Sequence, residues 1–249
     1  MGREVVNALC HEPEAELVGA VELQPAGDSL PLPDGSGRVP FSADLDHILT
    51  TCQPDVLVDF SKTQATLTAA RLATEKGVNL VIGTTGLTID DISEIDRLAK
   101  AHRVGVIAAP NFALGAVLMM HLAKIAAKYF DYAEIMELHH HQKADAPSGT
   151  ALSTAQGMAA VRGRPFLAPE QGRPSASRGQ QVNGVTIHSV RLPGLVAHQE
   201  VLLGGPGQTL SIRHDTIGRE CYMPGVMFAI KEVVKRRGFF LGLEQLLGL

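Results

Sequence analysis

Residues 55–60 read DVLVDF, a near-continuous apolar run of the kind found in strands that are covered on both faces. A helical pattern follows at residues 62–76 and stops at Gly77, and a second apolar strand is predicted at residues 79–82. Strands that alternate with helices imply right-handed crossovers, and hence a parallel, doubly wound sheet. The stretch therefore predicts an α/β fold.

The same alternation continues on both sides of this stretch. Further strands are predicted at residues 16–22 and 104–108, and further helices at 3–12, 43–52 and 88–102. The last of these helices opens on a capping box made by Thr88 and Asp91. Residues 24–40 are rich in Pro, Gly and Asp, and we expect a long loop there.

The pattern changes after Pro110. Helices are predicted at residues 114–129, 147–161 and 224–237, strands at 132–141, 185–191, 197–203 and 209–214, and a polar loop at 162–182. Strands that are separated by Gly and Pro rather than by helices favour an antiparallel or mixed sheet. The second half of the chain is therefore predicted to be an α+β unit with a mixed sheet.

Composition excludes several classes of function. The 249 residues are 45% apolar and carry a net charge of −4, so no basic surface indicates a nucleic-acid partner. No apolar run approaches a membrane span, and no signal peptide opens the chain. The three cysteines are few, odd in number and far apart, which fits a reducing compartment. We expect a cytoplasmic protein without a nucleic-acid or membrane partner.

Residues 137–151 read ELHHHQKADAPSGTA and carry the densest chemistry in the chain. Asp145 can cap a helix, and Pro147 suits its first turn. The backbone N–H groups of Ser148, Gly149 and Thr150 would then be free at a helix N-terminus, which attracts anions. Three imidazoles and an ammonium precede them. The segment therefore predicts a pocket for a small anion, with a proton donor and a fixed cation beside it.

The run of histidines has other interpretations. Adjacent strand residues point to opposite faces, so at most His139 and His141 share one. No Cys or nearby acid completes a tetrahedral set with them, apart from the more distant Glu137. A catalytic pair is favoured over a surface cluster, and both over a zinc site, because histidine suits proton donation and Lys143 adds a fixed charge. We predict no metal ligand.

Residues 137–151 resemble the signature of the dihydrodipicolinate reductases of bacterial lysine biosynthesis. That signature has an acidic residue, two His, a Lys four residues after the first His, and then DAPSGTA. The stretches VIGTTG at residues 81–86 and AAPNFALG at 108–115 are similar to the same family, in the same order and spacing. The resemblance implies reduction of 4-hydroxy-tetrahydrodipicolinate to tetrahydrodipicolinate by NADH or NADPH, for diaminopimelate and lysine biosynthesis.

The resemblance also implies how the chain is organised. Residues 1–112 and 220–249 would form the dinucleotide-binding domain. Residues 113–219 would form a domain that binds the small dicarboxylate substrate and joins subunits through its sheet, and we expect a homotetramer. A non-catalytic substrate-binding or regulatory relative and a His-cluster metal-binding module remain the alternatives.

Site residues follow from the same resemblance. It implies His139 as the proton donor and Lys143 as the group that stabilises developing charge. It implies that substrate is bound by His140, Ser148, Gly149 and Thr150. It implies that the cofactor is bound by Gly2, Glu22, Gly83, Thr84, Thr85, Ala109, Pro110, Asn111 and Phe112.

The cofactor residues are ambiguous when they are taken without the resemblance. Residues 83–86 would be a plain turn between strand and helix. Glu22 ends a strand and can hold ribose hydroxyls, although a strand-terminal Glu is more often only solvated. Leu23 follows it where relatives that use NADPH commonly have an Arg, so no cation is offered there to a 2′-phosphate. This favours NADH, with dual use possible.

One departure concerns the start of the chain. Residues 1–4 read MGRE, like the end of a G-x-G-x-x-G fingerprint of which Gly2 is the last glycine. The preceding strand normally lies in the middle of the sheet. We expect its loss to expose unpaired groups on its neighbours and to remove the phosphate cradle. A start site placed too late is the simplest account of this departure.

Overall fold

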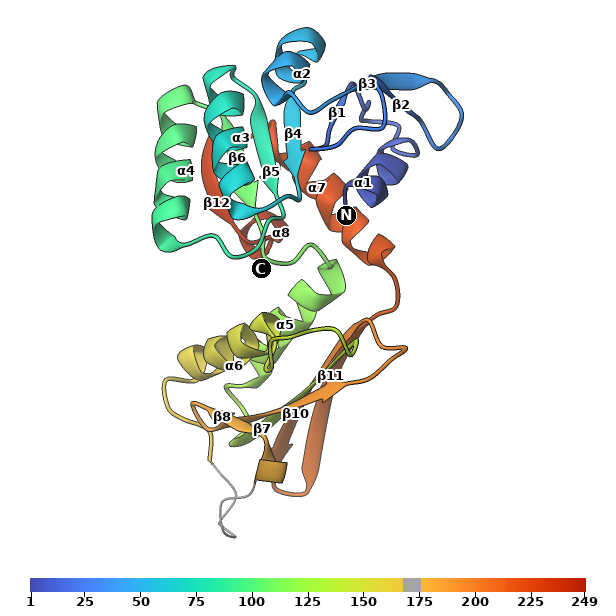
Figure 1. Ribbon diagram of the computed structural model, residues 1–249. Helices are drawn as coiled ribbons and strands as arrows, with labels where there is room; N and C mark the ends of the chain where they lie inside the picture. The colour runs from blue at the N-terminus through green and yellow to red at the C-terminus, as the bar shows by residue number, and fades with distance from the viewer. Residues whose placement is uncertain (168–175) are drawn as a thin grey trace. The chain divides into compact units, whose positions relative to one another are not determined.

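The computed structural model describes residues 1–167 and 176–249, which divide into two compact units (Figure 1). The first unit comprises Met1–Ala113 and Tyr222–Leu249, and the second comprises Leu114–Cys221. None of the helices in these described ranges combines the length and apolar character that a membrane span requires. Cys10, Cys52 and Cys221 are free thiols.

A four-stranded parallel sheet forms the centre of the first unit. Its order is β12-β6-β5-β4, from Gly238–Leu241, Gly105–Ala108, Asn79–Ile82 and Val56–Asp59. It packs against helices α3 (Thr63–Glu75), α4 (Ile89–His102) and α7 (Met223–Val233). The capping box of Thr88 and Asp91 is present at the start of α4.

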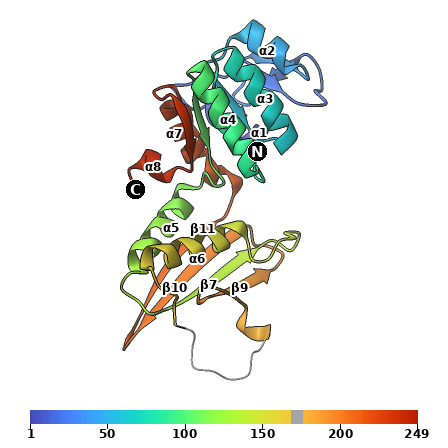
Figure 2. The ribbon, with the colours of Figure 1, turned by 90° about the vertical axis from the view of Figure 1, so that its left-hand side faces the viewer.

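The two faces of this sheet are covered by different helices (Figure 2). Leu80, Ile82 and Val106 point to one face and pack with α3 and α4 into a buried cluster. Gly105 points to the other face, where a Cβ atom would lie 2.2 Å from the carbonyl oxygen of Val233 in α7. Only glycine permits so close an approach of helix backbone to strand. The predicted doubly wound sheet is confirmed.

A separate small sheet corrects the predicted loop at residues 24–40. Its order is β1-β3-β2, from Ala20–Val21, Arg38–Ser42 and Ser29–Pro31. Most residues of this sheet are exposed or half-buried, so the strands carry no strong apolar alternation from which they could be predicted. The strand predicted at residues 16–22 is reduced to β1. Within the described residues, β1 pairs only with β3 and β4 only with β5.

The second unit has a five-stranded mixed sheet. Its order is β11-β10-β7-β9-β8, from Gln208–Thr216, Ala197–Gly205, Tyr132–His139, Val185–Arg191 and Gln180–Val182. Strands β7 and β9 are parallel and the other pairs are antiparallel, so the predicted mixed sheet is confirmed. Helices α5 (Leu114–Ala126) and α6 (Gly149–Arg162) cover one face, where they bury Ile135, Ile187 and Val201.

Other element ends differ from the prediction. Helices α1 (Gly2–Leu9) and α2 (Leu45–Cys52) are shorter than expected. The helix predicted at residues 224–237 ends at Val233, because the chain turns at Gly238, with φ of 94°, into the unpredicted strand β12. The short helix α8 (Glu244–Leu247) was not predicted either. Of the loop predicted at 162–182, residues 168–175 lie outside the described residues, and its end is strand β8.

Candidate active site

His139 is the last residue of β7, and a buried carboxylate holds it. Its Nδ1 lies 2.5 Å from Oε2 of Glu137, whose side chain is 0% exposed. Strand alternation places both residues on the face that α5 and α6 cover. An ionised carboxylate can only accept hydrogen bonds, so Nδ1 carries a proton and Nε2 is the ring nitrogen left free.

Glu137 has three further partners, Arg191, Ser148 and Ser189. Arg191, opposite His139 in the ladder of β7 and β9, donates from Nη1 to Oε2 at 2.9 Å and from Nη2 to Oε1 at 2.8 Å. The backbone N–H of Ser148 donates to Oε1 at 3.3 Å. Burial raises the pKa of Glu137, but hydrogen bonds from His139, Arg191 and Ser189 outweigh it and lower the pKa to about 2. Glu137 is therefore ionised at neutral pH.

The depressed pKa of Glu137 predicts a specific loss of stability in acid. Its pKa falls from 4.5 to about 2 on folding, so its contribution is complete above pH 4.5 and is lost as the pH falls to about 2. The size is on the order of 3 kcal/mol. Glu137→Gln has no such charge, and its free energy of unfolding should fall less steeply over this interval. Urea denaturation at several pH values measures this, and equal slopes for both proteins would contradict the assignment.

The turn after β7 corrects the predicted helix cap. Ser148, not Asp145, is the N-cap of α6, and its Oγ accepts a hydrogen bond from the N–H of Ala151 at 3.2 Å. The carboxylate of Asp145 instead accepts from Nζ of Lys143 at 2.7 Å. Pro147 precedes the cap rather than lying in the first turn. The helix therefore begins two residues later than predicted.

Two of the three N–H groups predicted to bind an anion remain open. The N–H of Ser148 is taken by Glu137, whereas those of Gly149 and Thr150 have no acceptor within residues 1–167 and 176–249. They lie in the first turn of α6, at the positive end of the helix dipole. Because Glu137 contacts both His139 and Ser148, it brings the predicted proton donor and the predicted anion-binding terminus together.

The rest of the histidine run lies beyond the strand. Strand β7 ends at His139 rather than at His141, and His140 and His141 are exposed in the turn that follows. The alternation argument therefore does not extend to them. Within the part of the chain that the structure describes, no group of three His, Cys, Asp or Glu side chains could hold a metal ion.

In the first unit, the loops after β4 and β5 meet at a buried carboxylate. Asp59 is 8% exposed and accepts hydrogen bonds from the Thr66 hydroxyl at 2.5 Å, the Ser61 N–H at 3.0 Å and the Thr84 hydroxyl at 3.3 Å. The Thr84 side chain is therefore directed inward, to a structural partner. Thr85 is exposed and keeps its hydroxyl on the surface of the loop.

The loop after β6 joins the same edge of the sheet. The N–H of Ala109 donates to the carbonyl of Ile82 at 3.0 Å, and the rings of Phe112 and Phe60 lie 5.7 Å apart. Ala109 and Phe112 are buried, Pro110 is exposed, and Asn111 accepts from the N–H of Ala113 at 2.9 Å.

The predicted nicotinamide-side residues gather at this edge of the sheet. A Cβ on Gly83 would lie 2.0 Å from the Phe60 ring, so the close approach of loop and ring requires glycine. The carboxyl ends of parallel strands are also where open α/β sheets bind such ligands. Residues 83–85 and 109–112 are thus brought together.

The two remaining cofactor residues are placed elsewhere in the first unit. Gly2 begins α1, and the position of its absent Cβ has no atom within 4 Å. Glu22 follows β1 in the small sheet, and its carboxylate accepts from the N–H of Leu23 at 2.9 Å. Neither forms a hydrogen bond with residues 83–85 or 109–112 in the described ranges.

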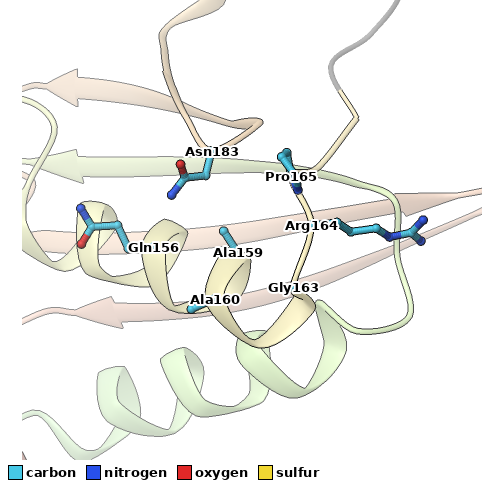
Figure 3. Close-up of a pocket in the computed structure, with 7 residues that line it drawn as sticks. All are labelled: Gln156, Ala159, Ala160, Gly163, Arg164, Pro165 and Asn183. Carbon is cyan, nitrogen blue, oxygen red and sulfur yellow. The ribbon is translucent and has the colours of Figure 1, made fainter.

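A cavity of about 310 Å³ lies near the C-terminal end of α6, away from the predicted site (Figure 3). It is lined by Gln156, Ala159, Ala160, Gly163, Arg164, Pro165 and Asn183. Arg164 is the only charged residue among them, and it pairs with Asp131 at 3.0 Å. None of the seven is a predicted site residue.

Sequence reasoning missed Arg191, and it considered Glu137 only as the acidic residue of the family signature and as a distant metal ligand. The two residues are 54 positions apart, and only the pairing of β7 with β9 joins them. One signal could have identified both residues. Each is a charged residue at a strand position that the alternation of side chains turns toward the protein interior.

Comparison with known families covers nearly the whole chain. Residues 1–112 match the family described as dihydrodipicolinate reductase, N-terminus, and residues 115–247 match dihydrodipicolinate reductase, C-terminus. These matched regions include every residue that the sequence analysis proposed for catalysis or binding.

Relatives with assigned activities are similar over their full length. The 4-hydroxy-tetrahydrodipicolinate reductase of Dehalococcoides mccartyi is 53% identical over 100% of this chain and 95% of its own, and that of Moorella thermoacetica is 48% identical over 99% and 94%. A dipicolinate-bound dihydrodipicolinate reductase from Paenisporosarcina sp. TG-14 superposes with a TM-score of 0.86 at 40% identity, covering 98% of this chain and 94% of that one.

Proposed function

This chain belongs to the dihydrodipicolinate reductase family, and on that premise we propose which of its residues carry out the reaction. The chain is an NAD(P)H-dependent oxidoreductase that reduces 4-hydroxy-tetrahydrodipicolinate to tetrahydrodipicolinate in lysine biosynthesis. One observation carries our assignment of the substrate site. The buried carboxylate of Glu137 contacts both His139 and the N-terminus of α6, so a proton donor and an anion site lie together.

The dicarboxylate substrate places one carboxylate on the N–H groups of Gly149 and Thr150, and His140 contacts it from the turn. When bound, NAD(P)H supplies the hydride that adds to ring C4 after water has been lost. Negative charge then develops toward the ring nitrogen, and Lys143 stabilises it. His139 donates a proton from Nε2 to the ring carbon between C4 and the carbon–nitrogen bond, where the displaced electron pair forms the new C–H bond, and Glu137 stabilises the imidazolium before the transfer. Lys143 can keep Asp145 as a partner, because that carboxylate oxygen engages one N–H of an ammonium that has three donors.

Dipicolinate, a planar dicarboxylate, should bind the second unit in competition with substrate. A charge-assisted hydrogen bond contributes about 1.5–3 kcal/mol. Lys143→Ala should therefore weaken dipicolinate binding roughly tenfold to a hundredfold. Thr150→Val removes a hydroxyl but leaves the backbone N–H, and its effect should be milder. Calorimetric titration measures both, and unchanged affinities in both variants would show that residues 137–150 are not the substrate site.

For the cofactor, we propose that the loops at residues 83–85 and 109–112 hold the nicotinamide side, while Gly2 and Glu22 contact the phosphate and ribose. Within these loops, the backbone and Thr85 face outward, whereas Thr84 and Phe112 support the loops from below. Leu23 is 83% exposed beside Glu22 and offers no positive charge. The preferred cofactor is therefore NADH.

Leu23→Arg tests the preference. A guanidinium at this exposed position can pair with the 2′-phosphate of NADPH, so kcat/KM for NADPH should rise about tenfold or more while that for NADH changes little. Leu23→Gln, which has similar length and no charge, is the control. If both cofactors respond equally to Leu23→Arg, the end of β1 does not contact the 2′-position.

We also propose a homotetramer joined through the sheets of the second unit, and a cytoplasmic location. The tetramer is carried over from the family resemblance, and the location is supported by the three free cysteines. The mass of the native protein by light scattering tests the first proposal.

A further inference from the structure

We propose that Arg191 is a positioning residue that holds both proposed catalytic groups, His139 through Glu137 and Lys143 through the backbone of Asp145. The proposal rests on the catalytic roles assigned to His139 and Lys143 above. Arg191 comes from β9, outside the segment that carries the family signature, and it is not assigned any direct contact with substrate.

The guanidinium of Arg191 spans three segments of chain. Besides its two bonds to Glu137, Nη2 donates to the carbonyl of Asp145 at 2.6 Å, and Nη1 donates to the carbonyl of Val190 at 2.8 Å. Its side chain is 18% exposed. A planar fork with fixed donors can serve a carboxylate and a carbonyl together, which a lysine ammonium cannot do with the same geometry.

Two arms lead from this guanidinium to the proposed catalytic groups. In one arm, the carboxylate of Glu137 accepts from His139 at 2.5 Å and so fixes the ring orientation and the proton on Nδ1. In the other arm, Arg191 donates to the backbone carbonyl of Asp145, and the carboxylate of Asp145 accepts from Nζ of Lys143 at 2.7 Å. The side chain of Arg191 therefore holds the end of β7 and the following turn in a fixed position relative to each other.

Arg191 and Glu137 also have opposite electrostatic effects on His139. The two charges have opposite signs, so removing one or the other should change the pH dependence of turnover in opposite directions. On the β10 side the neighbours are not ionised: Ala197 lies opposite His139, and Gln199 lies opposite Glu137.

Other charged or titratable groups surround the pair. His214 of β11 lies opposite Gln199, and burial lowers its pKa. Lys143 and Asp145 pair with each other in the turn, and the N-terminus of α6 adds a partial positive charge. Replacing Glu137 or Arg191 leaves these charges in the protein, although both residues also contact the turn, through the Ser148 N–H and the Asp145 carbonyl.

The experiment compares pH profiles of kcat for Glu137→Gln, Arg191→Met and Arg191→Lys. Glu137→Gln leaves an unpaired guanidinium near His139, so the alkaline limb should move to lower pH by about one unit or more. Arg191→Met leaves the carboxylate uncompensated, so the limb should move to higher pH. Arg191→Lys keeps the positive charge but loses the planar set of guanidinium donors. Its kcat should therefore fall, while the alkaline limb of its pH profile should stay nearly unchanged. For Arg191→Met we expect kcat to fall roughly a hundredfold through misplacement of the two groups.

Arg162→Met is the matched control. Arg162 is 3% exposed and donates to the carbonyls of Asp131 and Pro165, so it is also a buried arginine that joins segments of the second unit. Its loss should lower the melting temperature and leave the pH profile unchanged. If Arg191→Met does not fold, the other two variants still decide the question. Glu137→Gln should shift the alkaline limb, and Arg191→Lys should lower kcat without shifting it.

Opposite movements of the alkaline limb would support the proposal, because a merely structural role predicts none. Unmoved limbs and a near wild-type kcat in the Arg191 variants, with a melting loss like that of Arg162→Met, would overturn it. The double variant His139→Ala, Glu137→Gln separates failure of this proposal from failure of the proposed site. Because Glu137 acts through His139, the kcat of the double variant should be little lower than that of His139→Ala alone. A wild-type kcat in His139→Ala alone would instead rule out the proposed role of His139.

Discussion

His139→Ala is expected to lower kcat by about 10²–10⁴-fold, the usual contribution of a positioned general acid. The structure leaves Nε2 as the free ring nitrogen, because Glu137 holds Nδ1 at 2.5 Å. The loss should fall on kcat rather than on cofactor binding, since the proposed NADH loops belong to the first unit and His139 to the second. Steady-state kinetics together with fluorescence titration of NADH measure the two effects separately.

His141→Ala is the matched control for this prediction. It removes the same type of side chain two residues further along, where the imidazole is exposed beyond the end of β7. Its turnover should equal that of the wild type. A wild-type rate in His139→Ala, or an equal loss in His141→Ala, would contradict the choice of His139 as the proton donor.

Three strands of the parallel sheet could be predicted from their near-continuous apolar runs, whereas β12, whose residues are half-buried or exposed, was not predicted. Leu80, Val81 and Ile82 form a continuous apolar run of matching length, and the helices on either side carry clear starts and stops. The small sheet of the first unit could not be predicted in this way. Strands β2 and β3 are short and mostly half-buried or exposed, so the Pro and Gly around them dominated the pattern.

The candidate site was predictable only where its residues are close in the sequence. His139, Lys143 and the start of α6 lie within one short segment, and the family resemblance assigned their roles. The ion pair between Glu137 and Arg191 depends on the pairing of β7 with β9, which no local sequence pattern indicates. The N-cap was misplaced for a related reason, since Asp145 and Ser148 are both good caps and the contact with Lys143 decides between them.

Lys143→Ala is expected to lower kcat by about 10²–10³-fold, comparable to the loss of one donor that stabilises developing negative charge. Lys143 lies in the turn between His139 and the N-terminus of α6, and its side chain is 23% exposed. An ammonium there stabilises the negative charge that moves toward the ring nitrogen after hydride addition. Lys143→Gln keeps the length and a hydrogen-bond donor without the charge, so its rate should also be low. Stopped-flow measurement of NADH oxidation reports the chemical step directly.

The control for the charge is Lys128→Ala, which removes an exposed lysine from the second unit outside the signature segment. Its kcat should equal that of the wild type, because a solvated charge at the surface is screened. The Gln variant decides what Lys143 contributes. If Lys143→Gln retains a wild-type rate while Lys143→Ala does not, the side chain acts through hydrogen bonding or packing, and charge stabilisation must be assigned elsewhere. If both variants are slow and their kcat and kcat/KM fall by equal factors, the positive charge acts in the transition state rather than only in binding.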